Sequence, residues 1–147
     1  MKLMRKDGFT IIEILTTVTL MALLLTLIMP SLKQSYQQLQ MDAAIQTLHK
    51  DIRWAQRLAD QEQKRVMIQF HRDAQPYRYV VTVSGNKVSS KEVKLPDNLA
   101  KIEAKTIIIS PDKTFQNNGH VLIQKGAIRR YVYYYQTGRS RVTAKAA

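Results

Sequence analysis

A single acidic residue, Glu13, interrupts a long apolar stretch of the chain. Residues 9–29 carry no other charge, and the stretch is long enough to cross the hydrocarbon core of a membrane as a helix. A carboxylate in such a helix costs on the order of 2.5–3.5 kcal/mol of insertion free energy at the bilayer centre, and less near the interface. We therefore expect Glu13 to be paired with a cation.

The residues before Glu13 indicate where that cation could come from. A short basic leader ends at Gly8, and cleavage after Gly8 would leave a new α-amine on Phe9. Within one helix this amine and the carboxylate would pair weakly. Between staggered neighbouring subunits, the amine of one chain could meet Glu13 of the next. Two charges that are costly in lipid would then neutralise each other and set the register of assembly.

A second candidate site is a group of cations near the C-terminus. Arg139 and Arg141 alternate along an expected strand, which would space their guanidinium groups about 6–7 Å apart on one face, close to the spacing of successive phosphates. Three cations on the preceding expected hairpin could extend the patch, although only one of the two adjacent arginines can share its face: Lys125, Arg129 and Arg130. No acidic residue follows Asp112. The alternative is that these arginines protect a sheet edge from aggregation.

Tyrosines alternate through the same hairpin. Tyr131, Tyr133 and Tyr135 would line one face of the strand, and Tyr134 the other. Exposed tyrosines could stack on bases, as in proteins that bind single strands, whereas buried ones would belong to the core or to cross-strand packing. The arginines can pair only with phosphates. We therefore expect any nucleic-acid binding to be independent of base sequence and steeply dependent on salt.

Composition agrees with a polyanionic partner and argues against catalysis. The chain has 23 Lys and Arg against 11 Asp and Glu, a net charge of +12, and no cysteine, so thiolate metal sites and disulfides are excluded. The histidines, His49, His71 and His120, are far apart in sequence, which makes a metal site improbable. The chain contains no phosphate-binding loop and no nucleophile elbow. We expect neither an enzyme nor a cofactor.

Two kinds of element must position these residues. After the apolar stretch, residues 31–63 have a helical period, with one apolar stripe of Met41, Ile45, Leu48, Ile52, Ala55 and Ala59. A coiled-coil seam is the alternative, but alanine at the distal positions favours a helix that covers a sheet. Pro30 should kink or locally open the helix where it leaves the membrane, without necessarily ending it.

From residue 64 the period changes to two. Strands are predicted at residues 66–70, 77–83, 87–95, 106–109, 121–124, 128–136 and 139–142, with turns at Asn117-Asn118-Gly119, Lys125-Gly126 and Thr137-Gly138. The prediction is an α+β fold, in which a long N-terminal helix, first transmembrane and then amphipathic, packs on one antiparallel β-sheet. Basic residues before the apolar stretch place the N-terminus in the cytoplasm and the β-rich domain outside.

The segment Gly8-Phe9-Thr10-Ile11-Ile12-Glu13 resembles the class III leader of type IV pilins and pseudopilins, and Pro30 matches the position where that family carries a proline. The resemblance implies cleavage after Gly8 by a prepilin peptidase, N-methylation of Phe9, and an assembly role for Glu13. Together with the apolar stretch and the change of period, it predicts a leader (1–8), a transmembrane half-helix (9–30), an amphipathic half-helix (31–63) and a β-rich domain (64–147).

The strand-rich region, with Phe115 before Asn117-Asn118-Gly119, resembles the minor pseudopilins that include the secretion-system H component and the fimbrial T proteins. Its short leader, lack of cysteine and basic tail are similar to the D-type competence pseudopilins of Gram-positive bacteria. The motif Gly138-Arg139-Ser140-Arg141 resembles a DNA-contacting element of the fimbrial T proteins. The resemblance implies a subunit of a competence pilus that acts in assembly and DNA uptake, with sister pseudopilins as partners and a surface filament as its final location. The alternative is a structural subunit of a protein-secretion system that never touches DNA.

Overall fold

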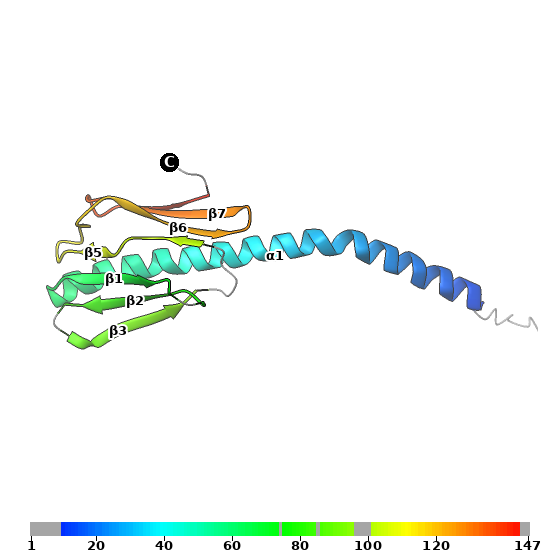
Figure 1. Ribbon diagram of the computed structural model, residues 1–147, viewed down its shortest axis with the longest axis horizontal. Helices are drawn as coiled ribbons and strands as arrows, with labels where there is room; N and C mark the ends of the chain where they lie inside the picture. The colour runs from blue at the N-terminus through cyan, green and yellow to red at the C-terminus, as the bar shows by residue number, and fades with distance from the viewer. Residues whose placement is uncertain (1–9, 74, 85, 96–100, 145–147) are drawn as a thin grey trace, which may run out of the picture. The chain divides into compact units, whose positions relative to one another are not determined.

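The computed structural model describes residues 10–73, 75–84, 86–95 and 101–144 (Figure 1). In this part of the chain, one long helix, α1 (Ile11–Glu62), is followed by strands. The strands are β1 (Val66–His71), β2 (Arg78–Val83), β3 (Asn86–Lys94), β4 (Lys101–Glu103), β5 (Ile107–Ile109), β6 (Gly119–Lys125), β7 (Ile128–Tyr134) and β8 (Ser140–Thr143). All strand pairs are antiparallel. The predicted α+β class is confirmed.

The chain divides into two compact units, Met1–Tyr36 and Gln37–Ala147. In the first unit, α1 leaves its large apolar side chains in contact with solvent, from 49% exposed at Ile28 to 79% at Ile11. A helix that is apolar all round and covered by nothing is typical of a segment that enters lipid. By length and composition, this part of α1 could cross a membrane. The helix continues through Pro30, and the kink or opening expected there stays a prediction.

Threonines within the apolar part of α1 do not leave their hydroxyl groups unsatisfied. Thr19 donates to the carbonyl of Leu15 at 2.7 Å, and Thr26 donates to the carbonyl of Leu23 at the same distance. Thr16 and Thr17 both donate to the carbonyl of Glu13. A hydroxyl that bonds back to its own helix removes most of the cost of placing it in lipid.

In the second unit, the predicted stripe of α1 is buried. Met41, Ile45, Leu48, Ile52, Ala55 and Ala59 are at most 1% exposed and form one cluster with the inward side chains of the strands. The helix ends at Glu62 because Gln63 adopts a left-handed conformation, with φ of 51°, a conformation that commonly terminates helices. The helix therefore covers the β-rich region, and the coiled-coil alternative is not needed to explain the stripe.

The prediction of one sheet was wrong, because the strands form two four-stranded sheets. Their orders are β3-β2-β1-β5 and β4-β6-β7-β8. Val66 and Val81 from the first sheet and Val121 and Val132 from the second enter the same core cluster as the helix stripe. Strand β5 follows β4 in the chain but pairs with β1, while β4 pairs with β6. The chain thus changes sheets between consecutive strands, which a strand-by-strand reading of periodicity cannot reveal.

Candidate functional site

Glu13 lies in the first turn of α1, and its side chain is exposed. Thr10 caps the helix, because its Oγ1 accepts a hydrogen bond from the Glu13 backbone N–H at 3.3 Å and its carbonyl accepts from Ile14 at 3.2 Å. A threonine cap followed at the third position by glutamate is a recognised helix-start pattern. Among residues 10–144 as described, no ion pair involves Glu13. Gly8 and Phe9 lie outside the described residues, so their pairing with Glu13 stays a prediction.

The second unit contains an open cleft of about 1220 Å³ between α1 and the turn that joins β7 to β8. Arg139 and Arg141 both line it, as does Arg53 from the helix, one turn before Arg57. The remaining lining residues are Gln56, Arg57, Asp112, Lys113, Asn118, Tyr135, Gln136, Thr137, Gly138 and Ser140. The predicted pair of C-terminal arginines is therefore joined by two arginines from a distant part of the sequence.

Gln56 fixes the two loops that border this cleft. Its side-chain amide donates to the carbonyl of Lys113 at 2.8 Å and to the carbonyl of Gly138 at 2.9 Å. Gly138 has φ of 80°, and a Cβ there would lie 2.9 Å from the Lys113 carbonyl oxygen. Only glycine fits this position without strain and collision. The turn that presents Arg139 is thereby held against the helix.

The cleft is strongly positive. Five cationic side chains line it, with Asp112 as the acidic one. Lys113 is paired with Asp60 at 2.8 Å, whereas among the described residues no ion pair involves Arg53, Arg57, Arg139 or Arg141. Hydrogen bonds from Thr114 hold the pKa of Asp112 below its ordinary value, so this carboxylate stays charged at neutral pH. The four arginines form a group of like charges, and a bound polyanion would reduce their mutual repulsion.

Two of the predicted DNA-contacting cations point elsewhere. Arg130 donates from Nε to the Asp42 carboxylate at 2.5 Å and is only 18% exposed, and Lys125 donates to the side-chain carbonyl of Gln40 at 3.3 Å. Both lie against α1 and not with the cleft. Arg129, next to Arg130, is exposed, but it does not line the cleft either, so the predicted extension of the patch by residues of this hairpin is not seen there.

His49 links the helix to the last strand. One of its ring nitrogens, Nε2, lies 3.0 Å from the Ser140 hydroxyl. Burial and then the charge of Arg53 lower the pKa of His49, and a hydrogen bond with the backbone of Ser140 opposes this change. His49 is therefore neutral at physiological pH and acts as a structural contact between α1 and β8. No group of His, Asp and Glu within the described residues could hold a metal ion.

The tyrosines of β7 alternate between two environments, as predicted. Tyr134 is 4% exposed and packs on Phe115 with ring centroids 5.3 Å apart. Tyr131 and Tyr133 lie on the opposite face, where their rings stack at 5.9 Å. Tyr131 is 8% exposed, and Tyr133 is partly exposed. The guanidinium carbon of Arg141 lies 6.0 Å from the Tyr133 ring centroid.

A buried carboxylate, Asp51, forms a separate structural cluster. Its Oδ2 accepts from the Tyr79 hydroxyl at 2.6 Å, and its Oδ1 accepts from Lys91 at 2.6 Å. Burial, and then the contact with Asp51, raises the pKa of Tyr79 above its ordinary range, so the phenol stays protonated and keeps donating. Asp51 is thus a paired buried charge that fastens β2 and β3 to the helix.

Comparison of the chain with protein families, curated proteins and solved structures finds no match.

Proposed function

We propose that this chain is a minor pseudopilin of a competence pilus, anchored in the membrane by residues 9–29, that assists filament assembly and contacts DNA through the arginine cleft. The observation that carries the DNA-binding part is the convergence of Arg53 and Arg57 with Arg139 and Arg141 on one open cleft. Arginine forms bidentate hydrogen bonds with phosphate. Four such groups, which form no ion pair with a carboxylate among the described residues, suit a phosphodiester backbone.

The assembly part of the proposal is supported by the start of the chain. An apolar helix of membrane length carries one carboxylate, Glu13, in its first turn. Cleavage after Gly8 by a prepilin peptidase would create the α-amine of Phe9, and this amine would neutralise Glu13 of a neighbouring subunit. Sister pseudopilins supply the neighbours. Pro30 would let the helix adapt where it leaves the bilayer.

The cleft favours the competence role over a secretion-system role, because the latter includes no contact with DNA. Binding should be independent of base sequence, because guanidinium groups that meet phosphates carry no base information. Affinity should fall steeply with salt, since each neutralised phosphate releases counterions.

The test compares DNA binding and transformation for two double variants of the full chain. Arg139→Ala/Arg141→Ala removes two cations from the cleft. Arg65→Ala/Arg72→Ala removes two exposed cations at the ends of β1, in the other sheet, and serves as the charge-matched control. Fluorescence anisotropy in detergent micelles at low salt should show about a 10-fold loss or more for the first variant only, and transformation frequency should follow. Equal DNA affinity of the two variants, or no DNA binding by the wild type, would favour the hypothesis of a structural role in a secretion system.

A further inference from the structure

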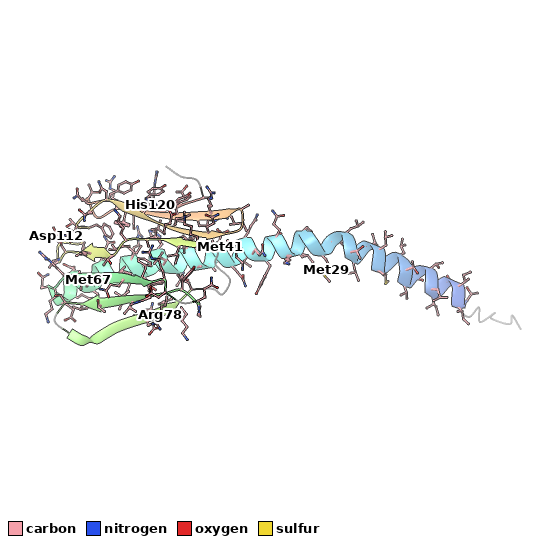
Figure 2. The ribbon with its side chains drawn as sticks, in the orientation of Figure 1. Met29, Met41, Met67, Arg78, Asp112 and His120 are labelled. Atoms are coloured by element: carbon pink, nitrogen blue, oxygen red, sulfur yellow. The ribbon has the colours of Figure 1, made fainter. Side chains whose placement is uncertain are left out.

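The sheet β4-β6-β7-β8 carries aromatic rings on the face that does not enter the core. His120 lies on β6, labelled in Figure 2, and Tyr131 and Tyr133 lie on β7. These are the two central strands of the sheet. The His120 ring is 5.5 Å from that of Tyr133 and 6.1 Å from that of Tyr131. One connected aromatic surface therefore occupies the middle of this face.

His120 and Tyr133 lie outside the buried core of the domain. On the same strands, Val121, Val132 and Tyr134 point inward and belong to the core cluster, whereas His120, Tyr131 and Tyr133 do not. Tyr131 is nearly covered and supports the sheet, as cross-strand aromatic contacts often do. His120 is exposed and Tyr133 is partly exposed. The stack of Tyr133 on Tyr131, with ring planes 17° apart, holds the accessible ring in a fixed orientation.

Positive charge borders this aromatic surface. Arg141 is the direct cross-strand partner of Tyr133, with its guanidinium carbon 6.0 Å from the ring centroid. It also lines the arginine cleft. Arg129, exposed on β7, lies at the other end of the same strand face. Arg141 thus connects the ring surface to the cleft, so one ligand could contact both.

We propose that this sheet face binds the bases of single-stranded nucleic acid by stacking on Tyr133 and His120, while the arginines of the cleft hold the phosphates. The inference rests on the proposed DNA-contacting function and adds a preference for strand type. An unpaired base offers its flat face to an aromatic ring, whereas bases in a duplex already stack on one another. The chain should therefore bind single strands more tightly than duplex DNA.

The experiment measures binding of the full chain in detergent micelles to three fluorescent probes at one salt concentration. These are an oligothymidylate, an abasic phosphodiester polymer of the same length, and a duplex of that length. The oligothymidylate should bind about 5- to 150-fold more tightly than the abasic polymer, the range that stacking of one base supplies. Tyr133→Leu should reduce this difference without changing the abasic affinity, because only His120 would remain to stack on a base, and Tyr133→Phe, which keeps the ring, should retain it.

The outcomes separate the two proposals. Failure of all three probes to bind removes the DNA-contacting function and this inference with it. Equal affinity for oligothymidylate and abasic polymer overturns only the stacking, and so does duplex binding that matches or exceeds single-strand binding. A neutral oligosaccharide that displaces the oligothymidylate from the wild type would assign the rings to a glycan and overturn the inference.

Discussion

Gln56 on α1 donates a hydrogen bond to the backbone carbonyl of Gly138, 2.9 Å away in the turn between β7 and β8. The same amide nitrogen donates to Lys113 at 2.8 Å. One side chain therefore fixes two loops, separated from it in sequence, at the border of the arginine cleft. The geometry of the cleft therefore depends on Gln56. Its role is to position the cleft and not to bind phosphate, because an amide binds phosphate less strongly than a guanidinium group does.

Replacing Gln56 by methionine should lower the free energy of unfolding by about 1–3 kcal/mol. The substitution keeps the length of the side chain but removes both hydrogen bonds, each worth about 0.5–1.5 kcal/mol. Urea unfolding in detergent micelles, followed by the fluorescence of Trp54, measures the change. The control is Gln61→Met, which removes an exposed amide from the same helix and should have an effect within about 0.5 kcal/mol. An equally large loss for Gln61→Met would contradict the stabilising role of the two Gln56 hydrogen bonds.

Arg57→Ala should weaken DNA binding and lower the salt dependence of binding. If Arg57 contacts one phosphate, the slope of log affinity against log salt should become shallower by about 0.7–0.9. The matched control is Arg130→Ala, because Arg130 is held by Asp42 away from the cleft. Arg130→Ala should leave the slope unchanged while reducing stability by up to about 1 kcal/mol, the usual range for a partly exposed ion pair. Equal slopes for both variants would argue against the cleft as the DNA site.

The sequence identified the C-terminal half of this cleft but not the helical half. Arg139 and Arg141 stand out because they alternate in an acid-free tail, whereas Arg53 and Arg57 appear as ordinary solvent-facing positions beside an apolar stripe. Their spacing of one helical turn does place them on one face. What brings that face to the β7–β8 turn is the packing of α1 on two sheets, which depends on long-range strand pairing.

Local sequence patterns do not reveal long-range packing, and this also explains the other differences between the predicted and the observed fold. The helix stripe was predicted residue by residue, because burial against a sheet leaves a strong periodic pattern. Strand β4 was missed, since Lys101, Ile102 and Glu103 supply only one apolar side chain. The inward positions of Arg130 and Lys125 were not predictable either, because they depend on Asp42 and Gln40, whose positions relative to the hairpin only the fold reveals.

Gly119→Ala should destabilise the second unit by about 1–3 kcal/mol, as expected for overpacking. An added Cβ would collide with the Tyr134 hydroxyl and lie 2.5 Å from the ring carbon Cζ. Tyr134 cannot move easily because it is buried against Phe115. The control is Gly126→Asn, at a position with φ of 58° and open space around it, where asparagine tolerates the left-handed conformation. Thermal unfolding should show a clear loss for Gly119→Ala and little change for the control.

Acidification should destabilise the wild type partly through His49. Burial and Arg53 keep the folded-state pKa of His49 below its ordinary value of 6.5. Between these two values the unfolded chain binds more protons, so stability is full above the ordinary pKa and falls as the pH drops toward the lowered one. His49→Gln should reduce this loss between about pH 7.5 and about pH 5.5, as measured by urea unfolding at both values. An unchanged pH dependence in the variant would exclude His49 as its source.

Glu13→Val should leave membrane insertion intact or improved, because it removes a charge from the apolar stretch, yet the subunit should fail to enter filaments. The reason is loss of the carboxylate that would pair with the Phe9 amine of a neighbour.

A competing explanation is that Glu13 only stabilises the start of α1, an effect worth about 0.3–1 kcal/mol. Thr10→Val separates the two, since it removes the cap that Thr10 supplies to the Glu13 N–H but keeps the carboxylate. Immunoblots of sheared filaments should detect Thr10→Val and not Glu13→Val. Equal loss of both variants would favour the helix-start explanation, and normal incorporation of Glu13→Val would refute the intersubunit pair.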